Sequence, residues 1–299
     1  SMVLRARLTD PSALLLLVRA IHFTAHASVS ISASGLEIAT ESSHAIQAHA
    51  YLYASIFAKY AFTPPDDGTH DDDIPYVCFE LNLETLVAAL TLVESGLHAR
   101  HADPVSVELT YDGIGHPLCF ATHEGTLQTR FQLRTLDAEP LESLGFDSER
   151  MATHVIMPSE WLGHAFQDIE ASGEAYVRVR VRAAGGGSGT RRTLVLSTRG
   201  THGSAEIELP DTDQLTEKFE SAGPTDNWYP LSCISHMLPA LRSSIKASLR
   251  TDVHGMLSVQ FMIASSRAGS RRSVAASGHA FVEFLCSPLD TEAIPALLD

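Results

Sequence analysis

The chain has 299 residues, of which 21 are Lys or Arg and 36 are Asp or Glu, for a formal net charge of −15. Hydrophobic residues make up 44% and charged residues 19% of the sequence, a globular composition that excludes a disordered chain. The acidic excess excludes a protein that grips nucleic acid with basic residues on every side, although one basic face on an acidic body is compatible with it.

The N-terminal region predicts neither a membrane anchor nor a secretory signal. Its longest apolar run, Ala13 to Val18, is ended by Arg19, whereas a bilayer span needs about 20 residues. No basic segment precedes the run and no small-residue cleavage pattern follows it. The four cysteines are far apart and form no CxxC pair, which favours reduced thiols in a cytosolic or nuclear protein over disulfides or structural zinc.

Four short amphipathic helices are predicted along the chain. Apolar residues at i, i+3, i+4 and i+7 from Leu14 to Ile21 predict the first, and Asp10-Pro11 is a typical start signal. The same spacing predicts helices over 83–90, behind Asn82, and over 162–169 and 231–241. Most of the remaining sequence alternates apolar and polar residues between turns rich in Gly, Asp and Ser, which predicts strands.

The order of these elements repeats: helix, strands, helix, strands, and then the same again. We therefore predict an α+β protein of two similar domains, each with two helices packed on antiparallel sheet, and not an alternating βαβ fold. The acidic stretch 136–150 lacks a regular pattern and is predicted to be an interdomain connecting loop. The domains would then be 1–135 and 151–299.

Sequence motifs of catalysis are absent. The chain has no G-x-x-x-x-G-K-[ST] phosphate loop, no G-x-G-x-x-G opening a helix and no G-x-S-x-G elbow. His123-Glu124 begins like a zinc-protease motif, but position 127 is Leu. The scattered carboxylates show no spacing that would converge on one cleft, as a two-metal nuclease requires. No catalytic, metal or cofactor site is therefore expected.

Several segments resemble one known family. In the first half they are Ala20-Ile21-His22-Phe23, His26-Ala27, Gly35, Gln47-Ala48 and Ile56-Phe57. In the second half they are Arg250-Thr251-Asp252, Gly255, Leu257-Ser258, Gln260, Met262-Ile263, Phe281-Val282-Glu283, Cys286 and Pro288. Together, and in this order, they are similar to the Rad-one subunit family of the nine-one-one DNA damage checkpoint clamp.

The resemblance implies the sliding-clamp fold of proliferating cell nuclear antigen. In that fold, three subunits of two domains each form a ring whose helices line the central hole. The family's ring is a heterotrimer with Rad-nine and Hus-one subunits, placed around double-stranded DNA in the nucleus by a loader related to replication factor C. It supports checkpoint kinase activation and DNA repair. No membrane contact and no cofactor are implied.

The resemblance also assigns roles to particular positions. Polar residues on or beside the four helices are candidates to face DNA: Arg19, Arg100, His164, Gln167, Arg242 and Lys246. Because the connecting loop of clamps borders an apolar pocket for short partner peptides, four of its residues are candidates to form or cover that pocket: Leu136, Leu141, Leu144 and Phe146.

Two alternatives stay open. A 3′-to-5′ exonuclease, an activity suggested for relatives in the family, would need a metal-binding carboxylate cluster. A homotrimeric replication clamp would share the fold and the acidic balance, and an exposed sheet edge looks the same in either assembly.

Overall fold

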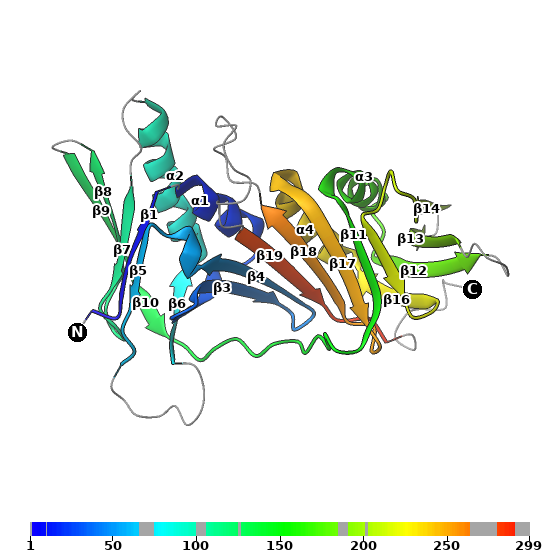
Figure 1. Cartoon of the computed structure of the whole chain (residues 1–299), viewed down its shortest axis with the longest axis horizontal. Coiled ribbons are helices and arrows are strands. Elements are labelled where there is room, and N and C mark those ends of the chain that lie inside the picture. The colour runs from blue at the N-terminus through cyan, green and yellow to red at the C-terminus, as the bar shows by residue number, and fades with distance from the viewer. Residues whose placement is uncertain are drawn as a thin grey trace. The chain divides into compact units, whose positions relative to one another are not determined.

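The computed structural model describes residues 2–9, 11–65, 75–99, 106–124, 127–184, 191–200, 203–263 and 280–290. The chain divides into two compact units. The first comprises Ser1–Thr40, His49–Glu142 and Ile263–Val282, and the second comprises Glu41–Ala48, Ser143–Met262 and Glu283–Asp299. The two units are described separately below, and Figure 1 labels their elements.

The first unit contains two helices, α1 (Pro11–Ala20) and α2 (Leu83–Ala99), that pack against each other. One antiparallel sheet has the order β5-β1-β7-β8-β9. The strands β10, β6, β2, β3 and β4 follow one another in a second sheet. The bounds are β1 Leu4–Leu8, β2 His26–Ser32, β3 Gly35–Ser42, β4 Ile46–Tyr53, β5 Lys59–Phe62, β6 Tyr76–Asn82, β7 Val107–Tyr111, β8 Leu118–Glu124, β9 Leu127–Leu133 and β10 Thr135–Asp137, with a 3₁₀ turn at Ala54–Ile56.

Local sequence explains the helix positions in this unit. Helix α1 begins at Pro11, whose fixed backbone angle suits the first helical position, and its apolar stripe is buried. The side chain of Asn82 accepts the backbone N–H of Thr85 at 2.8 Å, which satisfies one free donor at the start of α2. Helix α2 packs against β2, β6 and β9, and Phe79 and Tyr111 meet in the core with ring centres 4.6 Å apart.

The second unit also contains two packed helices, α3 (Ser159–Glu170) and α4 (Leu231–Ser243). One sheet has the order β14-β13-β12-β16, and the strands β19, β18, β17, β11 and β15 follow one another in another sheet. The bounds are β11 Met151–Pro158, β12 Tyr176–Ala184, β13 Arg191–Gly200, β14 Gly203–Pro210, β15 Lys218–Ser221, β16 Thr225–Pro230, β17 Ser244–Asp252, β18 Leu257–Ile263 and β19 Ala280–Cys286.

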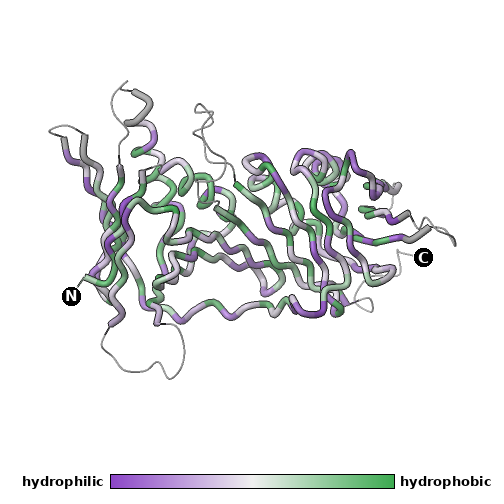
Figure 2. Tube along the Cα trace, in the orientation of Figure 1, coloured by the Kyte–Doolittle hydropathy of each residue, from purple (hydrophilic) through white to green (hydrophobic). Residues whose placement is uncertain are grey.

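Helices α3 and α4 cover sheet faces in the second unit. Helix α3 packs on β11, β13, β14 and β17, and α4 packs on β12, β16 and β17. The strand β12 shows the underlying pattern, because Val177, Val179 and Val181 are buried and the arginines between them are not. Figure 2 shows hydrophobic residues along the helices and the strands that they cover.

The four predicted helices and the predominance of antiparallel strands are confirmed in the described residues. The prediction that 136–150 is irregular throughout is wrong at its start. Residues Thr135–Asp137 form β10, in which Leu136 pairs with Glu80 of β6, because the edge of β6 offers free backbone donors and acceptors. Among the helices that the structure describes, none is long and apolar enough to cross a membrane.

Candidate nucleic-acid interface and connecting segment

Arg19 lies where α1 and α2 meet. It is exposed in the last turn of α1, where a cation interacts favourably with the helix dipole. Its Nη2 donates to Thr91 Oγ1 of α2 at 3.0 Å, and that hydroxyl donates to the carbonyl of Val87 at 2.7 Å. Among the described residues, no carboxylate forms an ion pair with Arg19, so this guanidinium is suited to contact a phosphate.

Helix α3 presents a polar stripe that includes His164 and Gln167, both exposed. Trp161, one turn earlier, is 44% exposed and meets the ring of His164 edge-on at 6.5 Å. Arg242 is exposed in the last turn of the neighbouring helix α4. The structure thus gathers three candidates on one helix pair, although no hydrogen bond joins these side chains in the described part of the chain.

Two further candidates differ from these. Lys246 lies in β17, half-buried, and its Nζ donates to Glu217 Oε2 at 2.6 Å, so its charge is already balanced by a carboxylate. Arg100 lies outside the described residues.

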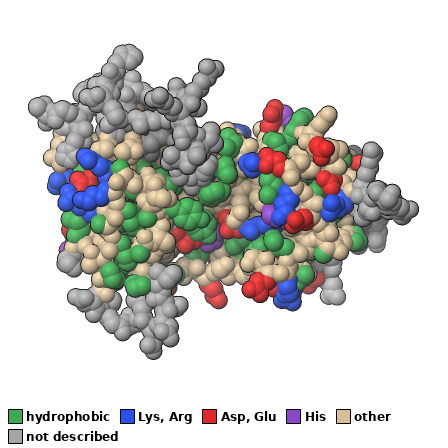
Figure 3. All heavy atoms as spheres, viewed as in Figure 1, with side chains coloured by type: hydrophobic (Ala, Val, Ile, Leu, Met, Phe, Trp, Pro, Cys, Tyr) green, Lys and Arg blue, Asp and Glu red, His purple; other side chains and the backbone are tan. Residues whose placement is uncertain are grey.

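The helices carry more acidic than basic residues, which the choice of DNA-facing candidates did not consider. Within their bounds, as described, Arg19 and Arg242 are the basic Lys or Arg residues, against five carboxylates. These carboxylates are Glu84, Glu94, Glu160, Asp168 and Glu170. Counting charges within the predicted helices would have revealed their net charge of −3, so Arg19 and Arg242 attract DNA only locally, against a net repulsion by the helices. Acidic and basic side chains also lie beside one another on the face of the molecule drawn in Figure 3.

The candidate pocket residues fall in both units. Leu136, in β10, is 51% exposed, and Leu141 is half-buried; both belong to the first unit. Leu144 and Phe146 belong to the second. The backbone N–H of Leu144 donates to Oε1 of the fully buried Gln47 at 3.1 Å, which anchors the segment within the second unit.

Phe146 packs against its own chain. Its ring centre lies 4.9 Å from Cζ of Arg250, which in turn donates to Glu283 Oε1 at 2.6 Å and to Ser258 Oγ at 2.7 Å. Beside it, the backbone N–H of Asp147 donates to Asp252 Oδ2 at 3.1 Å. The end of the connecting segment is therefore held on β17, β18 and β19 by residues of the segments that carried the family resemblance.

The cysteines and carboxylates give no sign of a metal centre where the chain is described. Cys78, Cys119, Cys233 and Cys286 are free thiols, and burial raises the pKa of Cys286 well above its ordinary value. In the described ranges, no group of three or more His, Cys, Asp or Glu side chains is placed to hold a metal ion.

Comparison with known proteins identifies the family. The sequence pattern of the family described as "Repair protein Rad1/Rec1/Rad17" matches residues 3–263. The chain belongs to this Rad1 family. It is 29% identical to the cell cycle checkpoint protein RAD1 of Mus musculus over 273 residues, which covers 91% of this chain and 87% of the mouse protein. It is 25% identical to the DNA repair exonuclease REC1 of Mycosarcoma maydis, covering 98% and 97% of the two chains.

A solved structure supports the fold. A chain of the PCNA2-PCNA3 complex from Sulfolobus tokodaii superimposes with a TM-score of 0.68 at 15% identity, over 95% of this chain and 98% of that one. The resemblance to the Rad-one family and the α+β sliding-clamp fold are thereby confirmed. The chain is a Rad1-family checkpoint and DNA repair protein with a clamp fold.

Proposed function

We propose that this Rad1-family chain is one subunit of a heterotrimeric ring, completed by Rad-nine-type and Hus-one-type subunits, that encircles double-stranded DNA in the nucleus. A loader related to replication factor C closes the ring on DNA, and the ring then serves as a platform for checkpoint kinase activation and repair proteins. The clamp fold in a member of a checkpoint family carries this proposal. We propose 1–135 and 151–299 as its two domains, joined by the segment 136–150, whose first two residues belong to β10.

The helix charges suit a ring that slides. A closed ring retains DNA by topology, so its side chains need to attract the backbone only weakly and need not recognise bases. Arg19 and Arg242 supply two phosphate contacts, and the five helix carboxylates limit their strength. Two such contacts correspond to a slope of roughly −2 in log affinity against log salt, a weak dependence for a DNA-binding protein.

Unpaired sheet edges offer sites for the partner subunits. In the sheet orders, β9 is the last strand of one sheet and β14 the first of another, and each pairs on one side with a single described strand. Such edges expose rows of backbone N–H and C=O groups that another chain can pair with. The opposite edges of the same two sheets are β5 and β16. We assign one edge strand of each unit, β9 or β5 in the first and β14 or β16 in the second, to the two subunit contacts of the ring.

The connecting loop is the proposed docking segment for partner peptides. Its candidate residues are Leu136 and Leu141, which belong to the first unit, and Leu144 and Phe146, which belong to the second, and each pair is considered on its own unit. Because Phe146 is packed against Arg250, a peptide that uses its position must first displace that ring.

A nuclease is the second candidate function, favoured by the name of the relative REC1, a DNA repair exonuclease. Metal-dependent digestion of a 3′ end that co-purifies with the chain, and is abolished by a single Asp or Glu substitution, would establish it. Digestion that separates from the chain on purification would exclude it.

The ring proposal is tested by topology. The assembled complex is loaded on a nicked circular plasmid and washed with high salt, and the plasmid is then cut once. We expect the complex to remain on the circle and to leave the linear DNA by sliding off its ends. Equal loss from circular and linear DNA would contradict encirclement.

A further inference from the structure

One face of the sheet β14-β13-β12-β16 concentrates arginine. Arg178, Arg180 and Arg182 alternate along β12 with the buried valines, so all three lie on the side opposite to the valines. Because α4 packs on β12 and the valines are buried, this "arginine face", defined by Arg178, Arg180 and Arg182, points away from the helices.

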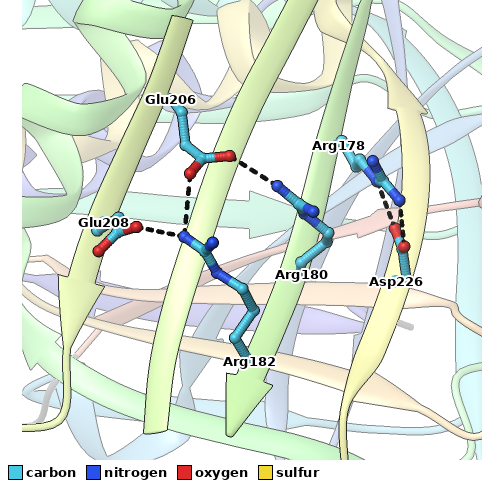
Figure 4. Close-up of polar contacts among 6 residues, drawn as sticks. All are labelled: Arg178, Arg180, Arg182, Glu206, Glu208 and Asp226. Carbon is cyan, nitrogen blue, oxygen red and sulfur yellow. Dashed lines mark hydrogen bonds and ion pairs between the residues drawn. The ribbon is translucent and has the colours of Figure 1, made fainter. Parts of the chain in front are cut away.

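Carboxylates from the neighbouring strands hold these arginines in place (Figure 4). Arg178 donates two parallel hydrogen bonds to the carboxylate of Asp226 in β16, and the bond from Nε is 2.6 Å long. These bonds raise the pKa of Arg178. Its guanidinium also lies 5.2 Å from the ring centre of Trp228. Side chains fixed in this way lose little further entropy when they bind a ligand.

On the other side, the arginines reach across β13 to β14. Arg180 donates to Glu206 Oε2 at 2.7 Å, and Arg182 donates to Glu206 Oε1 at 3.0 Å and also to Glu208. A guanidinium has five N–H donors, and among the described residues these bonds engage only a minority of the donors on the three arginines. The Nε of Arg180 is buried from water and has no hydrogen-bond partner in the described part of the chain.

A cavity of about 150 Å³ opens on this face. It is lined by residues from all four strands, among them Arg178, Arg180, Arg199, Ser197, Ser204 and Trp228. The lining residues include three arginines and one carboxylate, Glu206, so their net charge is positive, and they also include three hydroxyl residues and one tryptophan. Guanidinium forks match the geometry of phosphate oxygens, which accept several such donors at once.

We propose that the arginine face binds a phosphorylated, acidic segment of a partner protein, with the phosphate in this cavity. A protein segment is favoured over DNA because the face lies on the side of the sheet away from the helices, which the clamp fold directs toward DNA. The proposal adds a binding site to the proposed ring but does not depend on it, because it can be measured on the isolated chain.

The probe is a fluorescent peptide of sequence Glu-Asp-phosphoserine-Asp-Glu, with its unphosphorylated form as comparison, measured by anisotropy against the full chain. We expect the phosphorylated peptide to bind at least tenfold more tightly. Arg178→Lys with Arg180→Lys keeps both charges but loses the forks, and should weaken binding about tenfold. Arg134→Gln removes an exposed cation from the first unit and should leave affinity within twofold.

A second variant separates binding from structure. Glu206→Gln removes the carboxylate that competes for Arg180 and Arg182, so it should strengthen phosphopeptide binding several-fold even if it lowers the melting temperature. Equal binding of the two peptides, no effect of either variant, or displacement of the phosphopeptide by a 20-base-pair duplex would each overturn the proposal. If the phosphopeptide binds as expected but the plasmid test fails, the ring proposal is contradicted and the phosphopeptide site is not.

Discussion

The ring of Phe146 lies 4.9 Å from the guanidinium carbon of Arg250, although 103 residues separate them in the chain. Arg250 and Glu283 are each only 15% exposed, so the aromatic ring helps to shield an ion pair from water. This contact fixes the end of the connecting segment on the second unit. A peptide that bound at this position, as we propose, would compete with Phe146 for Arg250.

Phe146→Ala should loosen this segment more than it unfolds the protein. Loss of the cation–π contact and of the apolar cover costs about 1–2 kcal/mol of unfolding free energy. We expect faster proteolysis between residues 141 and 150, followed by mass spectrometry, with a small change in melting temperature. Phe146→Leu, which keeps apolar cover, is the matched control. Unchanged proteolysis in the Ala variant would show that the ring does not hold the segment.

Gly255 has a left-handed backbone at the turn between β17 and β18, and a side chain there would displace the amide of Asn227. Its φ is +81°, and an added Cβ would lie 2.4 Å from Asn227 Oδ1. Its carbonyl accepts the hydroxyl of the buried Tyr229 at 2.6 Å. Gly255→Ala should therefore lower the unfolding free energy by about 1–3 kcal/mol, measured by urea titration. Gly115→Ala, also at positive φ (+80°) but with nothing near its Cβ, controls for backbone strain alone. If both variants lose the same unfolding free energy, contact of the added Cβ with Asn227 makes no contribution.

The helices carry two arginines and five carboxylates, so removing arginines and removing carboxylates should have opposite effects on DNA retention. Arg19→Gln with Arg242→Gln should flatten the salt dependence of DNA retention by about 2 in log–log slope. Glu160→Gln with Asp168→Asn should lengthen retention about threefold, since both carboxylates are exposed on α3.

Asp213→Asn with Glu139→Gln changes the net charge by the same amount away from the helices and serves as control. If the control variant lengthens retention as much as the α3 variant does, retention depends on net charge alone and the helix residues have no specific role in it.

The stability of the chain should fall as the pH drops below 6.5. Burial, with Lys218 and Arg250 nearby, lowers the pKa of His154 below its ordinary 6.5, while Glu220 opposes this. The unfolded chain then takes up a proton that the folded chain resists, so stability is full above pH 6.5 and is lost as the pH falls toward the folded pKa. Burial also lowers the pKa of His236, so this residue contributes to the same loss of stability at low pH.

His154→Gln, which can still bond Ser248, should lose less melting temperature between pH 7.5 and pH 5.5 than the parent chain. An equal or larger loss in the variant would contradict this origin of the pH dependence.

Local patterns predicted the elements but not the contacts between them. The stripe from Leu14 to Val18 lies within α1 and the cap at Asn82 begins α2, so each can be recognised from a few neighbouring residues. The pair Arg178–Asp226 depends on the register of two strands, which no local pattern specifies.

The same limit applied to the candidate sites. The partner of Lys246, Glu217, lies 29 residues away, so its neutralised charge could not be foreseen. Arg19, His164, Gln167 and Arg242 were placed on helix surfaces because helical spacing separates buried from exposed positions. Whether they contact DNA depends on an assembly that one chain's sequence does not encode in any local pattern.

The most direct test of the ring is the solution mass, measured by light scattering, of the chain alone and mixed with Rad-nine-type and Hus-one-type subunits. The chain has a mass of 32.3 kDa. We expect the chain alone to stay near this mass and to enter a 1:1:1 complex when both partners are present. A stable species near 96.9 kDa from the chain alone, three times 32.3 kDa, would mean a self-assembling clamp and would contradict the heterotrimer.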